Sequence, residues 1–179
     1  MNFQPLEIPD LILVTPRVFS DSRGYFYEGY NQTVFEKGGI REHFVQDNYS
    51  LSSKGVFRGL HYQLPPRAQA KLVSVLRGAA LDVMLDVRKN SKTFGKAVTY
   101  RLTGEKKEMI FVPPGFAHGF CALEDNTEFM YKVTDFYSPA HERGILGSDP
   151  DILVKWPSLS FILSDKDQKY PRLKDAEVF

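Results

Sequence analysis

The residues with the clearest capacity for chemistry gather around one histidine, His61, in the segment Arg58-Gly59-Leu60-His61-Tyr62-Gln63. Arg58 precedes it by three residues, and Lys71 follows by ten and opens an otherwise apolar run. An imidazole titrates near neutral pH and can take up or release a proton. The alternatives are a structural histidine and a lysine that blocks pairing at a sheet edge. The grouping favours a functional histidine.

The strand that carries this segment needs an irregularity if its polar side chains are to act together. Successive side chains of a strand point to opposite faces, so Arg58 and His61 would diverge on a regular strand. Gly59 permits a bulge that brings both to one face, and we expect one there. Downstream, Tyr131 is predicted to point inward, as a core or a functional tyrosine. Tyr137 precedes Ser138-Pro139 and is expected in a loop over a pocket mouth.

A metal site is a second reading of the histidines. Pro113-x-Gly115-x-x-His118 matches half of the cupin metal signature. The other half requires two histidines one residue apart and then a glutamate, which the residues after His61 do not supply. Lys71 would also repel a cation, so we expect no metal and no cofactor. A site built from His61, His118 and a distant carboxylate is the alternative.

The elements that must position these residues are mostly strands. Apolar runs or alternating patterns predict strands at 72–76, 81–87, 98–103, 109–112, 119–123 and 128–134, with Asp82 and Asp86 on a solvent face. This spacing predicts an all-β jelly-roll sandwich or barrel with a few short helices. Helical signals are limited to a helix capped by Asn31 and a turn capped by Ser164. One domain over 1–179 is expected, with residues 148–179 packed back on the barrel through Trp156.

Composition excludes several classes of protein. The 179 residues are 42% hydrophobic and 25% charged with a net charge of +1, which excludes coiled-coil and disordered chains. Basic residues are dispersed, so we expect neither a nucleic-acid nor a membrane partner. The one cysteine, Cys121, is predicted to be a buried core residue. With no recognisable secretion signal, a cytoplasmic protein is expected. His43 and His141 have polar neighbours and are expected to be exposed.

Several segments in order carry a resemblance that covers nearly the whole chain. The sequence resembles the dTDP-4-dehydrorhamnose 3,5-epimerase family, a metal-free branch of the cupin-like jelly rolls. The segments are Asp21-Ser22-Arg23-Gly24-Tyr25-Phe26-Tyr27-Glu28, Gln46-Asp47-Asn48-Tyr49-Ser50, Gly55-Val56-Phe57-Arg58-Gly59-Leu60-His61-Tyr62-Gln63, Gln69-Ala70-Lys71-Leu72-Val73, Phe111-Val112-Pro113-Pro114-Gly115-Phe116-Ala117-His118-Gly119-Phe120, Tyr131-Lys132-Val133-Thr134, Asp149-Pro150 and Ser164-Asp165-Lys166-Asp167.

The resemblance implies a role for each matching position. It implies His61 as general base, Asp167 as the carboxylate that orients it, Tyr131 as the acid on the opposite face of the sugar, and Lys71 as the cation that stabilises an enolate. The implied substrate-binding residues are Arg23, Phe26, Glu28, Gln46, Asn48, Arg58, His118, Tyr137, Glu142 and Lys166. Phe26 and Tyr137 would be aromatic contacts to the nucleotide or sugar. A homodimer that exchanges strands is also implied.

The implied reaction inverts C3 and C5 of a dTDP-4-keto-6-deoxyhexose in dTDP-L-rhamnose biosynthesis, and its chemistry suits these residue types. Hydrogens next to the ketone are weakly acidic, and inversion needs a base on one face and an acid on the other. The charge that develops on O4 needs a fixed donor or cation. The alternatives are a C3-only or C5-only epimerase of a related nucleotide keto-sugar, a non-catalytic nucleotide-sugar binding module and a metal-dependent cupin.

Overall fold

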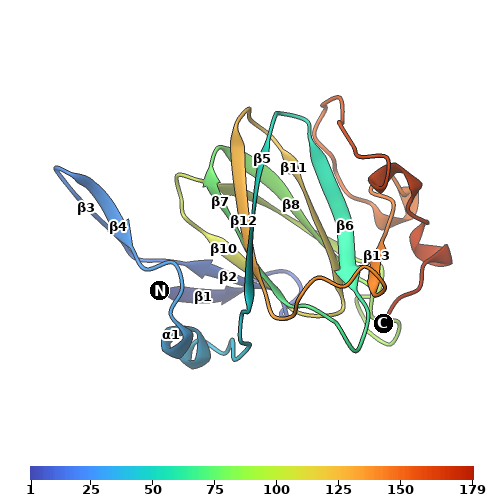
Figure 1. The fold of residues 1–179 in the computed structure, drawn as a ribbon, viewed down its shortest axis with the longest axis horizontal. Helices are drawn as coiled ribbons and strands as arrows, with labels where there is room; N and C mark the ends of the chain where they lie inside the picture. Colours follow the sequence, from blue (N-terminus) through green and yellow to red (C-terminus); the bar gives the residue numbers. More distant parts are fainter.

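Two antiparallel sheets stacked face to face form the body of the protein (Figure 1). A computed structural model describes residues 1–179. The six-stranded sheet has the order β1 (Asn2–Pro5), β2 (Ile12–Thr15), β10 (Met109–Val112), β7 (Lys71–Arg77), β12 (Thr127–Val133) and β5 (Gln46–Ser52). The five-stranded sheet has the order β13 (Glu142–Gly144), β6 (Phe57–Gln63), β11 (Phe116–Ala122), β8 (Ala79–Asp86) and β9 (Ala97–Thr103). This architecture confirms the predicted all-β jelly roll.

The predicted strands correspond to β7, β8, β9, β10, β11 and β12, but the predicted exposure of β8 is wrong. Asp82 and Asp86, placed on a solvent face by alternation, are both 0% exposed. Asp82 accepts a hydrogen bond from the His118 ring across the sheet. Asp86 is bonded by the Arg88 guanidinium and the Ser91 hydroxyl. Donors replace the water that Asp86 and Asp82 Oδ1 lose, whereas Asp82 Oδ2 is buried without a hydrogen-bond partner.

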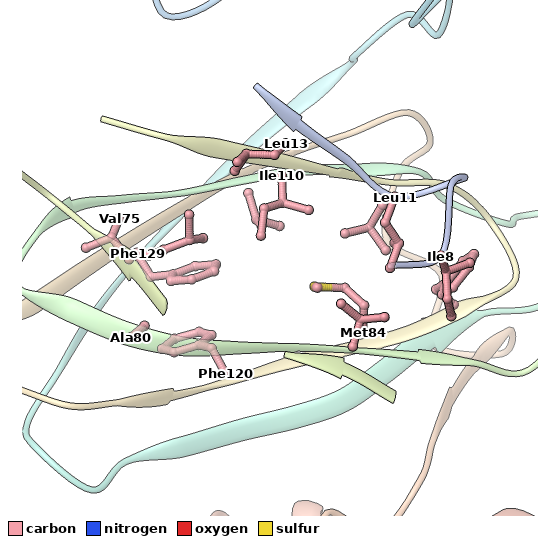
Figure 2. Packing of buried hydrophobic residues seen from close by; sticks show 14 residues of the cluster. Ile8, Leu11, Leu13, Val75, Ala80, Met84, Ile110, Phe120 and Phe129 are labelled. Atoms are coloured by element: carbon pink, nitrogen blue, oxygen red, sulfur yellow. The ribbon is translucent and has the colours of Figure 1, made fainter. Parts of the chain in front are cut away.

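An aromatic pair holds the two sheets together beside the site described below. Phe120 of β11 stacks on Phe129 of β12 with ring centroids 3.9 Å apart and planes 4° from parallel. Figure 2 shows the pair at one end of the layer of aliphatic side chains between the sheets, with Met84 and Ile110 farther along. Stacking and burial of rings this large fix the separation of the sheets locally.

The C-terminal segment covers the outer face of the five-stranded sheet (Figure 1). Trp156 packs edge-on against Phe57 of β6, with centroids 4.9 Å apart, and its indole donates to the Gly147 carbonyl at 3.0 Å. Within this segment three short 3-10 turns occur, η1 (Pro150–Ile152), η2 (Asp167–Lys169) and η3 (Leu173–Asp175). The Ser164 hydroxyl accepts from the Asp167 backbone N–H at 3.1 Å and so caps the turn that leads into η2, as predicted.

The only α-helix is α1 (Gln32–Lys37), and it begins where the sequence predicts. The Asn31 side chain accepts from the Val34 N–H, and Gly38 follows the last helical residue. None of the helices has the length and apolar character needed to cross a membrane.

A hairpin of β3 (Val18–Asp21) and β4 (Gly24–Tyr27) extends away from the sandwich (Figure 1). The sequence patterns did not predict it. Most of its aromatic side chains are open to solvent, with Phe26 69% exposed and Tyr25 59% exposed. A short hairpin with large exposed rings has no core of its own to bury them in.

The structure also tests the predicted exposure of one cysteine and two histidines. Cys121 is fully buried, as predicted, and burial raises the pKa of its thiol to about 11. His43 is exposed, but the expectation for His141 is wrong because this residue is half-buried. The Ser138 hydroxyl lies 2.8 Å from His141 Nδ1 and holds the ring against the loop that precedes β13.

Candidate active site

A cavity of about 910 Å³ lies between the two sheets and brings the four implied catalytic side chains together. His61 comes from β6, Lys71 from β7, Tyr131 from β12 and Asp167 from η2. Parts of β5 and β11 complete the wall. The cavity therefore draws residues from both sheets and from the C-terminal segment.

A bulge in β6 turns Arg58 and His61 to the same cavity. Across β6 and β11, His61 pairs with His118 and Arg58 pairs with Phe120, so three steps on β6 face two on β11. Gly59 has φ +136°, and a Cβ there would lie 2.6 Å from the Gly119 Cα. Glycine is thus required by conformation and by close packing of the strands. The structure has the bulge that we expected, and both side chains line the cavity.

The imidazole of His61 is paired with a buried carboxylate. His61 Nε2 lies 2.6 Å from Asp167 Oδ1, and the Asp167 side chain is 5% exposed. Burial tends to raise the pKa of the Asp167 carboxyl, but hydrogen bonds from His61 and Ser164 outweigh it and lower the pKa below the usual value. The ionised carboxylate accepts a hydrogen bond from the protonated Nε2. The other ring nitrogen, Nδ1, then carries no proton and is the basic nitrogen. Nδ1 has no hydrogen-bond partner in the protein.

Tyr131 faces the same cavity from the opposite sheet. Burial and the nearby Glu142 carboxylate raise the pKa of its phenol, while Arg58 acts in the other direction. The phenol therefore keeps its proton at neutral pH. A basic imidazole and a protonated phenol thus reach one cavity from two different sheets.

Lys71 spans the space between the sheets. It begins β7 in the six-stranded sheet, and its Nζ donates to the His61 carbonyl of the facing sheet at 3.0 Å. β7 lies between β10 and β12, so an edge lysine is excluded. Burial lowers the pKa of Lys71 to about 8, while the Asp82 and Glu142 carboxylates favour the charged form. The ammonium is therefore mostly protonated at pH 7.

A second buried pair, His118 and Asp82, lies beside His61. His118 is directly opposite His61 in the strand pairing, and its Nε2 lies 2.8 Å from Asp82 Oδ1. Burial lowers the pKa of His118, with the Asp82 charge acting against it. Asp82 was missed as a site residue; the available signal was an acid in a strongly apolar strand. No group of three or more histidine, cysteine, aspartate or glutamate side chains is arranged to hold a metal ion.

A polar group forms the rim of the cavity. The Tyr137 hydroxyl donates to Glu142 Oε2 at 2.7 Å, and the Lys166 ammonium bonds the same oxygen. Lys166 lines the cavity, whereas Tyr137 and Glu142 lie outside its lining and are connected to it through the bond between Glu142 and Lys166. Burial tends to raise the pKa of the Glu142 carboxyl, but the bonds from Lys166 and Tyr137 lower it overall.

The remaining implied binding residues divide into two sets. Gln46 and Asn48 of β5 are joined by a 2.8 Å hydrogen bond, and Asn48 pairs with Tyr131 across the strands. Arg23, Phe26 and Glu28 belong to the projecting hairpin or follow it, are exposed, and do not line the cavity of their own chain.

The fold and this site define a jelly-roll protein with a cavity suited to acid–base chemistry, because an imidazole and a phenol face it from two sheets. A family model described as dTDP-4-dehydrorhamnose 3,5-epimerase matches residues 5–175. The chain belongs to that family and is an isomerase, as its resemblance implied.

Similar proteins agree over the full length. A dTDP-4-dehydrorhamnose 3,5-epimerase of Shigella flexneri is 52% identical, over 100% of this chain and 99% of its own. A Legionella pneumophila enzyme, solved with dTDP-4-keto-L-rhamnose, superposes with a TM-score of 0.94 at 43% identity, over 97% of this chain and 93% of that one. ChmJ, a 3′-monoepimerase of Streptomyces bikiniensis solved with dTDP-quinovose, has a TM-score of 0.90 at 32% identity, over 95% and 87% of the chains.

Proposed function

We propose that this protein is a dTDP-4-dehydrorhamnose 3,5-epimerase, which inverts C3 and C5 of a dTDP-4-keto-6-deoxyhexose on the route to dTDP-L-rhamnose. The observation that carries the proposal is the placement of His61 and Tyr131 on facing sheets of one cavity. A base and an acid on opposite sides of a ring are what inversion at a carbon next to a ketone requires.

Each inversion is a pair of proton transfers through an enolate. His61 Nδ1 takes the proton from the sugar carbon next to the ketone. The C–H electron pair forms a double bond between that carbon and C4, and the C4=O4 pair moves to O4, which gains negative charge. The Lys71 ammonium stabilises this oxygen, and Asp167 stabilises the imidazolium. Tyr131 then donates its proton to the other face of the carbon. The imidazolium and the phenolate return to their starting states by proton exchange with solvent, and the pair acts again at the second carbon.

Tyr131→Phe is expected to separate proton removal from inversion. The variant keeps His61 and Lys71, so in heavy water the substrate should still exchange its C3 and C5 hydrogens. Net inversion should fall about 10²- to 10³-fold because the donor on the second face is lost. Exchange and product formation can be followed together by NMR.

The wild-type protein is the reference for that experiment. Deuterium should enter both C3 and C5; entry at one position alone would support a monoepimerase such as ChmJ, and no entry would support a binding module. An equal loss of exchange and inversion in Tyr131→Phe would contradict the role of Tyr131 as the acid.

We further propose a homodimer in which the β3–β4 hairpin of one chain completes the cavity of the other. The hairpin carries Arg23 in its turn and Phe26 on β4, both exposed and outside the cavity of their own chain. An arginine suits the diphosphate of the substrate, and an exposed ring suits its base or sugar. The single buried cysteine is consistent with a reducing compartment, and we propose the cytoplasm.

Mixing two inactive variants tests the shared site. Arg23→Ala lacks a hairpin contact and His61→Ala lacks the base, so each alone should be nearly inactive. After subunit exchange, half of the dimers should be mixed, each with one intact cavity, and activity should approach about a quarter of the wild-type rate per chain. Activity that stays at the level of the separate variants, with mixed dimers verified by mass spectrometry, would exclude the exchange.

A further inference from the structure

One buried amide, that of Gln63, connects the catalytic strand to the rim of the cavity. Gln63 lies on β6 two residues after His61, on the same face of the strand, and is 3% exposed. It does not line the cavity. Glutamine is seldom buried unless its amide is hydrogen-bonded. The hydrogen-bond partners of Gln63 therefore indicate what the side chain does in the structure.

Those partners are backbone groups on both sides of Tyr137. Gln63 Oε1 accepts from the Ser138 N–H at 2.7 Å, and Nε2 donates to the Phe136 carbonyl at 3.3 Å. The same nitrogen donates to the Arg67 carbonyl at 2.6 Å. The peptide groups before and after Tyr137 are therefore held by one side chain that is rigid within the sheet.

The strand pairing extends this connection to the rest of the rim. Gln63 pairs with Glu142 across β6 and β13, and Glu142 bonds both the Tyr137 hydroxyl and Lys166. Tyr137 itself is 53% exposed, so packing against a core does not orient its ring. Its direction is set by the backbone on either side of it and by the bond to Glu142.

We propose that Gln63 is a positioning residue of this enzyme, which fixes the Phe136–Ser138 loop so that Tyr137 presents its ring to the nucleoside diphosphate of the substrate. The proposal rests on the proposed function for the nature of the ligand. It assigns to Gln63 a part in binding the nucleotide, while proton transfer stays with His61, Lys71 and Tyr131.

Gln63→Met tests the assignment because methionine has a similar length and no amide. The dissociation constant of dTDP, measured by calorimetry, should rise roughly tenfold, within the range that one aromatic stacking contact supports. KM should rise by a similar factor, while kcat changes less than about threefold because the variant removes binding equally from ground state and transition state.

The matched control is Tyr62→Phe, in the neighbouring residue of the same strand. Its hydroxyl donates to the Glu177 carbonyl at 2.6 Å, so this variant also removes a buried bond from a side chain to the backbone, but on the other face of β6. It should leave the affinity for dTDP unchanged. If Gln63→Met and Tyr62→Phe have the same affinity as each other, the proposal is wrong.

A double-mutant cycle shows whether Gln63 acts through Tyr137. Gln63→Met should weaken dTDP binding strongly in the wild-type background and little in Tyr137→Ala, because the ring it orients is then absent. Equal effects in the two backgrounds would overturn the proposal. If wild-type protein neither binds dTDP nor exchanges substrate hydrogens, the proposed function fails instead, and the two failures are thus distinguishable.

Gln63→Glu gives an independent route if the methionine variant does not fold. A protonated glutamic acid keeps one donor and one acceptor, whereas the ionised form presents oxygen to the carbonyls of Phe136 and Arg67. Burial favours the protonated form. The affinity of this variant for dTDP should therefore recover towards the wild-type value as pH falls, relative to wild type measured at each pH. An affinity ratio that does not change with pH would contradict the proposal.

Discussion

His61→Ala is expected to abolish exchange of the C3 and C5 hydrogens with solvent. His61 and His118 both have a buried carboxylate partner on Nε2, but the His61 side chain is 31% exposed and that of His118 only 6%, so His61 is the ring that is open to a substrate in the cavity. Removal of a general base of this kind costs about 10²- to 10⁴-fold, and we expect the upper part of that range because Asp167 cannot replace the ring from its position behind it. Hydrogen–deuterium exchange followed by NMR measures the loss directly.

The controls for this variant separate a lost base from a damaged cavity. His43→Ala, which removes an exposed imidazole outside the cavity, should exchange at the wild-type rate. Added imidazole should restore part of the exchange to His61→Ala if the space left by the ring is intact. Wild-type exchange rates in His61→Ala would show that another group is the base.

Lys71→Met is expected to change activity and stability in opposite directions. The loss of the ammonium should lower kcat about 10²- to 10³-fold, the usual cost of removing a donor to a developing oxyanion. The free energy of unfolding at pH 7 should rise by about 1–3 kcal/mol, because methionine fills similar space without the cost of burying a charge. Steady-state kinetics and urea denaturation measure the two effects.

The pH dependence of stability has a defined sign for this lysine. Its pKa in the folded protein, about 8, is below the ordinary lysine value of 10.5, so the charged form destabilises the fold. The penalty is complete below pH 8 and diminishes as pH rises from there to about 10.5. Lys71→Met should lack this component. The wild-type kcat should in turn fall above pH 8 as the ammonium loses its proton.

A lysine of equal burial provides the control for both measurements. Lys107 is also 8% exposed, but its ammonium lies over the Tyr25 ring at 4.5 Å and outside the cavity. Lys107→Met should leave kcat unchanged. If Lys71→Met retained wild-type kcat, the role of Lys71 in stabilising the enolate would be wrong.

The strands could be predicted where side chains alternate, and the exposure of their polar members could not. Asp86 has donors within seven residues, Arg88, Ser91 and Thr93, which a local reading could have noted. Asp82 has its partner 36 residues away, at His118. Alternation alone treats both acids as solvent-facing because it takes no account of donors that arrive from other strands.

Features of the site that depend on residues close together in the sequence could be predicted, and features that depend on distant residues could not. The bulge at Gly59 follows from strand parity within four residues and is present in the structure. The pairing of His61 with Asp167 spans 106 residues and entered only through the family resemblance. The order of the strands, which places β6 and β12 in different sheets, is a property of the whole chain that no single segment encodes.

The division of base and acid between two sheets makes the spacing of the reactive groups depend on interior packing. The stacked rings of Phe120 and Phe129 act as a fixed spacer between β11 and β12, next to His118 on one strand and Tyr131 on the other. A protein core can lose a methylene group and still fold, whereas proton transfer slows strongly when the reacting groups shift by about an ångström. Substitutions that only loosen the packing between the sheets would thus impair turnover in a chain that still folds. Selection should therefore preserve these two rings for the rate of the reaction as much as for the stability of the fold.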